Sequence, residues 1–138
     1  MSLRKNAKIQ LLRWVPLFSG CSSKELGQIA TIADEISVPP EDELIREGDR
    51  GREFFALIEG SADVKRKGRM LSTFGPGDFF GEIAIVAETP RTATVTTTAP
   101  SRLLIIVDRD FDRLLAETPS LPLKVLRELA HRLAPLAI

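Results

Sequence analysis

Seven of the nine glycines lie between Gly48 and Gly81, where they separate short runs that are apolar or that alternate between apolar and polar residues. Such runs are typical of β-strands, and glycine supplies the positive φ angles of the tight turns between them. The runs cover residues 36–38, 44–46, 54–58, 62–64, 70–74, 93–96 and 103–107. Many short strands with frequent turns predict a barrel or a jelly roll.

Helical patterns frame this region on both sides. Before it, an apolar pattern stops at Pro16, and Ser22 and Glu25 have the spacing of a capping box that begins a second helix. After it, residues 108–117 and the apolar positions from Leu123 to Leu133 predict two more helices. We therefore expect one mostly β domain over 1–138, with N-terminal helices in 4–33, a β-roll in 35–107 and C-terminal helices in 108–134.

Charge and hydropathy limit where in the cell the protein is expected and which classes of partner it is expected to bind. Nineteen basic residues balance nineteen acidic ones, so the chain has no general attraction for nucleic acid or for an anionic membrane. No apolar run is long enough to span a bilayer, and the first residues lack the charged-then-apolar pattern of a signal peptide. Cys21 is the only cysteine and cannot form an internal disulfide. These observations predict a cytoplasmic protein without a nucleic-acid or membrane partner.

The sequence also argues against catalysis. His131 is the only histidine and lies in the last helix, so the several histidines of a metal-dependent jelly-roll enzyme are missing. No nucleophile stands beside a base, and no acid–base pair is evident. We expect neither catalytic residues nor a metal or cofactor.

The segment 77–95 carries the features of an anion site. Gly81 allows close approach of a ligand to the backbone, and residues 82–86 can form one helical turn with free N–H groups. Arg91 presents a planar fork that can hold two phosphate oxygens, and Glu82 can accept a hydrogen bond from a sugar hydroxyl. Thr92 adds a hydroxyl beside Arg91. One acid and one arginine fit a sugar phosphate.

This segment resembles the phosphate-binding cassette of the cyclic-nucleotide-binding domain family, to which the cAMP receptor protein and the regulatory subunits of protein kinase A belong. It matches the pattern Phe-Gly-Glu-Leu-Ala…Pro-Arg-x-Ala-x-Val, with Ile83 in the leucine position. The cassette covers residues 78–95. Residues 15–20, 45–64 and 126–133 resemble the family as well, so the resemblance extends over most of residues 11–133.

The resemblance implies an eight-stranded β-roll, also called a jelly roll or double-stranded β-helix, with helices at both ends. It implies that Glu82 binds the ribose 2′-hydroxyl and Arg91 the cyclic phosphate. Backbone groups around Gly81, Ile83, Ala84 and Ala93 would complete the cradle, with Thr92 beside it, and Val64 and Leu71 would line the base. An apolar residue of the last helix, such as Leu133 or Leu136, would close over the base.

The resemblance therefore implies a regulatory sensor domain that prefers cAMP and transmits the signal of ligand binding through its C-terminal helices. A threonine after the cassette arginine often accompanies cGMP recognition in this family, so cGMP stays an alternative at Thr92. A second alternative is a protein-interaction module that binds no nucleotide. We expect the effector to lie outside this chain, and a homodimer is a further possibility. The basic run 65–69 is interpreted as a solvated hairpin tip without a function.

Overall fold

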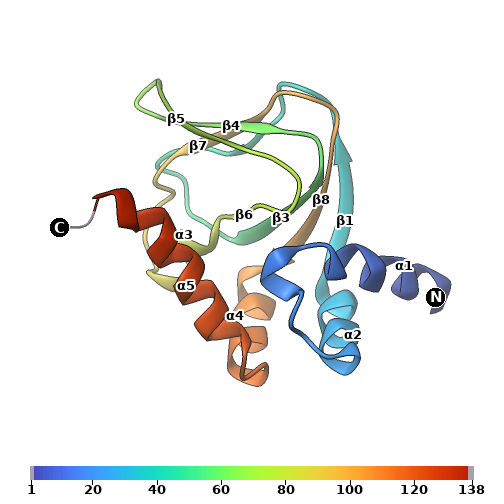
Figure 1. The fold of residues 1–138 in the computed structure, drawn as a ribbon. Helices are drawn as coiled ribbons and strands as arrows, with labels where there is room; N and C mark the ends of the chain where they lie inside the picture. Colours follow the sequence, from blue (N-terminus) through green and yellow to red (C-terminus); the bar gives the residue numbers. More distant parts are fainter. Residues whose placement is uncertain (1, 137–138) are drawn as a thin grey trace.

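The computed structural model describes residues 2–136 and arranges eight antiparallel strands in two four-stranded sheets (Figure 1). The sheets have the orders β1-β8-β3-β6 and β2-β7-β4-β5. The strands are β1 (Asp34–Val38), β2 (Glu43–Ile45), β3 (Glu53–Glu59), β4 (Ala62–Arg66), β5 (Arg69–Phe74), β6 (Phe79–Phe80), β7 (Thr94–Thr97) and β8 (Ser101–Val107). The predicted eight-stranded β-roll is confirmed.

Each of the seven predicted runs is a strand, and the eighth strand, β6, is the one that the sequence did not predict. It has two residues, too few to show a period of two. Its partner β3 places Phe80 opposite Phe55 and Phe79 opposite Ala56. This short pairing fixes the chain immediately before Gly81, so β6 is the element that positions the candidate site.

Neighbouring phenylalanines divide the interior into two cores, because successive side chains of a strand point to opposite faces. Phe54 faces the helices and stacks on Phe111 with ring centroids 4.6 Å apart. Phe55 faces the inside of the roll and stacks on Phe80 at 5.1 Å. The first core attaches the helices to the sheet, and the second forms the floor beneath the candidate site.

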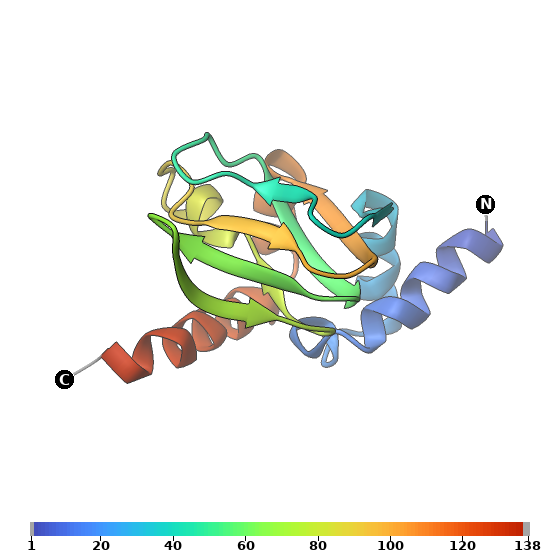
Figure 2. The same ribbon diagram turned by 90° about the horizontal axis from the view of Figure 1, so that it is seen from above.

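The helices gather at one end of the roll, and α1 and α5 extend to opposite sides of it (Figures 1 and 2). The predicted capping box is present at α2, because Ser22 and Glu25 exchange hydrogen bonds of 3.1 and 2.7 Å. The helical elements are α1 (Ser2–Arg13), η1 (Pro16–Phe18), α2 (Ser23–Ile32), α3 (Glu82–Val86), α4 (Asp108–Glu117), α5 (Leu121–Leu133) and η2 (Ala134–Leu136). None of the helices in residues 2–136 has the length and apolar character needed to cross a membrane.

Candidate functional site

Gly81 connects strand β6 to helix α3 in a conformation that excludes a side chain. Its φ is +93°, in the left-handed region. A Cβ atom here would lie 2.6 Å from the carbonyl oxygen of Glu53 and 3.0 Å from Nη1 of Arg91. Glycine is therefore required both by the backbone angle and by the space. The turn starts α3 at Glu82, and this confirms the helical turn predicted for 82–86.

Arg91 is a buried arginine whose guanidinium is held by two backbone carbonyls. Nη1 donates to the oxygen of Gly81 and Nη2 to that of Glu53, both at 2.8 Å. The carboxylate of Glu53 lies 3.6 Å from Nη2. Burial lowers the pKa of Arg91, and the carboxylates of Glu53 and Glu82 oppose that shift. Two of the five guanidinium N–H groups are occupied in this way, so the cation retains donors for a ligand.

Glu82 is almost completely buried, with 1% of its surface exposed, and it is paired with a residue of the last helix. Nη1 of Arg132 donates to its Oε1 at 2.7 Å. Its Oε2 is buried and has no hydrogen-bond partner among the described residues. Burial raises the pKa of this carboxyl, and the charge of Arg132 is the largest of the influences that lower it. Glu82 therefore has one acceptor oxygen in use and one available.

Arg132 reaches the site from α5 through further contacts. Its guanidinium donates to the carbonyl oxygen of Phe79. It also lies over two aromatic rings, 4.5 Å from the centroid of Phe79 and 5.6 Å from that of Phe74, distances at which a cation is attracted to a ring face. A single side chain thus connects α5 to β6, to α3 and to the floor of the roll.

A cavity of about 140 Å³ opens between the roll, α3 and α5, and all nine residues predicted for the site line it. Val64 is buried in its wall, whereas Leu71 is half exposed at its rim. The predicted lining residues are Val64, Leu71, Gly81, Glu82, Ile83, Ala84, Arg91, Thr92 and Ala93. The structure therefore brings them together around one space, and their roles toward a ligand stay predictions.

Six further lining residues were not predicted: Ile45, Arg66, Phe74, Phe80, Val95 and Arg132. The apolar ones follow from strand alternation, as Val64 and Val95 are paired across β4 and β7. Arg66 belongs to the run interpreted as a solvated hairpin tip. That run does form the exposed β4–β5 hairpin, as predicted, and Arg66 at its base also lines the cavity.

The last helix places a different residue at the cavity from the one expected. Leu133 is 61% exposed and is not among the lining residues, whereas its neighbour Arg132 is. The side chain of Leu136 lies outside what the structure describes. In this structure the contribution of α5 to the cavity is therefore a cation rather than an apolar lid.

The cavity combines a buried guanidinium with free donors, a buried carboxylate with a free oxygen, and apolar walls. Such a set can hold a small molecule that has an anionic group, a hydroxyl and an apolar ring. In the described part of the chain, no three His, Cys, Asp or Glu side chains are grouped so that they could hold a metal ion. The arrangement is suited to binding.

Comparison with known proteins agrees with this chemistry. Residues 35–118 match the family model described as the cyclic nucleotide-binding domain. The cAMP-dependent protein kinase regulatory subunit of Yarrowia lipolytica is 34% identical over 106 residues, which are 75% of this chain and 28% of that protein. The chain thus spans little more than a quarter of that relative.

Two solved structures are similar over nearly the whole chain. The regulatory subunit of a cAMP-independent protein kinase A from Trypanosoma brucei has a TM-score of 0.84 and 26% identity, over 94% of this chain and 47% of that one. The regulatory domain of Toxoplasma gondii protein kinase A in complex with cAMP has a TM-score of 0.80 and 26% identity, over 92% and 51%. This chain spans about half of each.

Proposed function

Because the chain belongs to the cyclic nucleotide-binding domain family, we propose that it is a regulatory sensor domain whose preferred ligand is cAMP. The observation that carries the proposal is that a buried guanidinium and a buried carboxylate line the same cavity. Arg91 has donors left over for an anion, and Glu82 has a buried oxygen without a partner. A buried acceptor without a partner is costly, so a ligand hydroxyl that donates to it adds binding free energy.

In the proposed complex, Arg91 holds the cyclic phosphate and Glu82 accepts the ribose 2′-hydroxyl. Backbone groups at Gly81, Ile83, Ala84 and Ala93 surround the phosphate, and Val64 and Leu71 contact the base. The apolar walls suit either purine, so the choice of base depends on polar groups at the rim. Thr92, with an exposed side chain, is the residue there through which cGMP could compete.

Transmission of the signal is assigned to α5. Oε1 of Glu82, the carboxylate proposed to bind ribose, is bonded to Arg132 of that helix. A ligand that draws the carboxylate toward its hydroxyl changes the free energy of this contact, and a ligand shifts a conformational equilibrium only through such a difference. Coupling between nucleotide and helix thus passes through a single shared group.

The proposal includes one non-enzymatic domain over 1–138 that acts in the cytoplasm, where a free thiol such as Cys21 is stable. The effector that receives the signal is a partner protein or domain of unspecified kind, and a homodimer is compatible with the exposed leucines of α5, such as Leu126. No nucleic acid takes part.

Isothermal titration calorimetry with cAMP and cGMP tests the proposed function. We expect saturable binding with one nucleotide per chain and tighter binding of cAMP. Tighter binding of cGMP would reverse the assignment of the base. If neither nucleotide releases heat and neither shifts the melting temperature of the protein, the domain binds no cyclic nucleotide. That result would favour the nucleotide-independent interaction module.

A further inference from the structure

The β4–β5 hairpin carries four cations that do not stabilise the hairpin itself. Arg66 and Arg69 lie directly opposite one another in the register of the two strands. Like charges in this position are destabilising. Within residues 2–136, none of Lys65, Arg66, Lys67 and Arg69 has a carboxylate within ion-pair distance. The cations therefore require another explanation.

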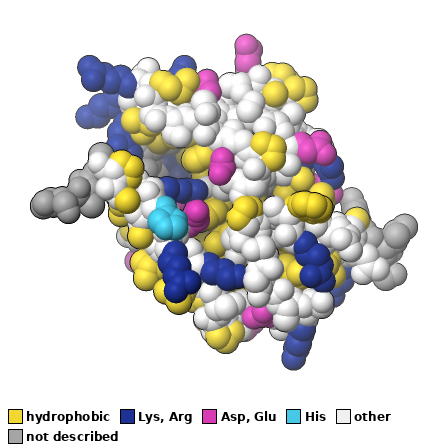
Figure 3. Space-filling view, in the orientation of Figure 1, with side chains coloured by type: hydrophobic (Ala, Val, Ile, Leu, Met, Phe, Trp, Pro, Cys, Tyr) yellow, Lys and Arg dark blue, Asp and Glu magenta, His cyan; other side chains and the backbone are white. Residues whose placement is uncertain are grey.

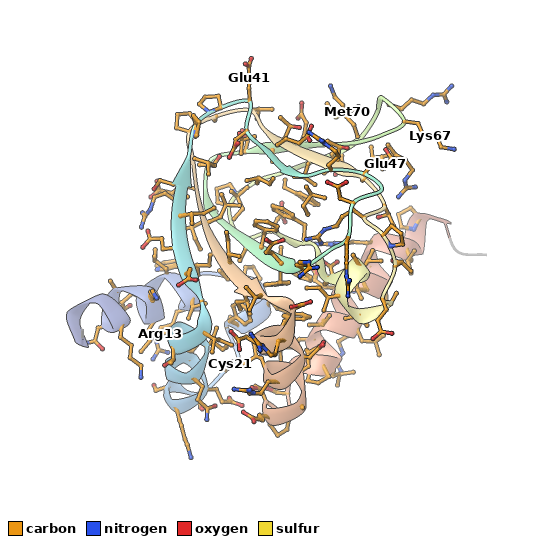
Figure 4. The ribbon with its side chains drawn as sticks, turned by 180° about the vertical axis from the view of Figure 1, so that it is seen from behind. Arg13, Cys21, Glu41, Glu47, Lys67 and Met70 are labelled. Carbon is orange, nitrogen blue, oxygen red and sulfur yellow. The ribbon has the colours of Figure 1, made fainter. Side chains whose placement is uncertain are left out.

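The figures show where these charges lie. Lys and Arg side chains gather at the upper left of Figure 3, over the hairpin tip, and others lie in the hollow between the hairpin and α5. Figure 4 shows Lys67 and Met70 at the tip with Glu47 beneath them, and Oε1 of Glu47 accepts a hydrogen bond from the backbone nitrogen of Lys67. The tip is thus fixed beside the cavity by a backbone contact that leaves the cationic side chains unpaired.

Arg66 is the member of this group that faces the cavity. Ala62 and Val64 of β4 are buried in the roll, and Arg66 is the next residue on the same face, because strand side chains alternate with a period of two. It lines the cavity, whereas Lys65, Lys67 and Arg69 do not. Its Nε donates to the carbonyl oxygen of Thr92 at 2.8 Å. Arg66 is thereby tied to the loop that carries Arg91.

The hydrogen bond to Thr92 leaves the best donors of Arg66 available. It uses Nε, so both terminal nitrogens remain, and these form the fork that binds two oxygens of a phosphate. Arg91 contributes a second guanidinium to the same cavity from the buried side. Arg66, unlike Arg91, has no carboxylate within ion-pair distance in the described part of the chain. An anion with several acceptor oxygens can therefore accept from its free terminal nitrogens and from Arg91 at once.

We propose that Arg66 is a second anion contact of the site, which closes over the outer oxygen of the bound phosphate while Arg91 holds the phosphate from inside. The proposal rests on the proposed function and names a residue of this chain that the cassette pattern does not include. Because Arg66 is exposed and Arg91 is buried, Arg66 can approach after the ligand has entered.

The test compares Arg66→Gln with Arg69→Gln. Both substitutions remove one positive charge from the same hairpin, but only the first removes a lining residue. Affinities for cAMP and for cGMP are measured by calorimetry at low and high salt, and thermal melting of each variant confirms folding. We expect Arg66→Gln to weaken both nucleotides by about tenfold, as for one charged hydrogen bond, and Arg69→Gln to change them by less than about twofold.

Each other outcome overturns the inference. Equal losses in the two variants would mean that the hairpin acts through its general field and not through a contact. A loss of affinity for only one of the two nucleotides would mean that Arg66 contacts the base and not the phosphate. An affinity of Arg66→Gln within about twofold of the wild type at both salt concentrations would remove it from the site. If the wild type binds neither nucleotide, the proposed function is wrong, and the role of Arg66, which depends on it, is wrong as well.

Discussion

The carboxylate of Glu82 and the guanidinium of Arg132 meet at 2.7 Å although fifty positions separate them in the sequence. The pair joins the first residue of α3 to the last turn of α5. Glu82 is buried and Arg132 is about one-third exposed, so the contact lies at the border of the cavity. Neither element has another ion pair of this kind among the described residues.

Arg132→Ala is expected to lower the free energy of unfolding by about 1–3 kcal/mol, since loss of the partner of a buried charge costs several kcal/mol and partial exposure reduces this cost. Urea unfolding measures the change. Arg127→Ala provides the control, because Arg127 is exposed on the same helix. Equal effects of the two substitutions would show that the pair contributes nothing beyond a surface charge.

Stability should depend on pH through Glu82. Burial raises the pKa of its carboxyl, so the folded chain binds more protons than the unfolded chain between the ordinary and the raised value. The free energy of unfolding therefore falls as the pH rises through this window. Glu82→Gln has no proton to lose, so its stability relative to the wild type should increase over the same range and then level off.

Urea titrations of both proteins at several pH values measure this difference. Glu88→Gln serves as the control, because it makes the same exchange at an exposed position. Parallel curves for wild type and Glu82→Gln would contradict the buried, destabilised carboxylate. A difference of the opposite sign would mean that the pairing with Arg132 outweighs burial.

Arg91→Ala should weaken cAMP binding by roughly 2–5 kcal/mol, about thirtyfold or more, because the ligand's charge is left without a buried partner. Calorimetry measures the loss. The substitution also removes donors from the carbonyls of Gly81 and Glu53, so we expect about 1–3 kcal/mol less stability as well. Arg91→Lys separates the contribution of the charge to binding from that of the fork, since it keeps the charge and loses the fork.

The motif and the strand pattern predicted much of this site, and the parts that they missed have physical causes. Glu82 and Arg91 both belong to the cassette pattern, so the resemblance implied that they share one site although α3 and a loop lie between them. Arg132 comes from a helix whose rotation is set by tertiary packing. One position along a helix turns a side chain by about 100°, so choosing Leu133 instead of Arg132 selects a different face.

Arg66 was hidden for another reason. The run 65–69 is polar at nearly every position, so the inward and outward faces of the strand have no contrast in the sequence. Only the burial of Val64 in the structure shows which side chains of β4 point into the roll. The fold itself was predictable because glycines and apolar runs alternate sharply, whereas β6 had too few residues to show a pattern.

Gly81 and Gly68 allow a matched comparison of space and backbone angle. Both have positive φ, +93° and +76°, but a Cβ would meet the carbonyl of Glu53 at 2.6 Å in the first and nothing within 4 Å in the second. Gly68→Ala should cost about 1 kcal/mol from the angle alone. Gly81→Ala should cost clearly more and should weaken cAMP binding, because it also displaces Arg91. Equal costs in urea unfolding would show that the turn can relax.

The choice between bases can be tested at Thr92, whose side chain is exposed at the rim while its backbone carbonyl holds Arg66. Thr92→Ala removes the hydroxyl together with the γ-methyl group and keeps the carbonyl. A change in affinity for one nucleotide only reports the hydroxyl, because the methyl group makes no polar contact that distinguishes the two bases. If the hydroxyl contacts guanine and not adenine, the substitution weakens cGMP by about fivefold to tenfold, as for one net hydrogen bond, and leaves cAMP within about twofold.

Calorimetry with both nucleotides on wild type, Thr92→Ala and the exposed control Thr89→Ala measures the effect. Equal losses for cAMP and cGMP would place the hydroxyl on the shared sugar phosphate. Unchanged affinity for both would mean that the hydroxyl of Thr92 takes no part in the choice of base. A specific loss of cGMP would establish that the preference for cAMP is opposed by one hydroxyl at the rim.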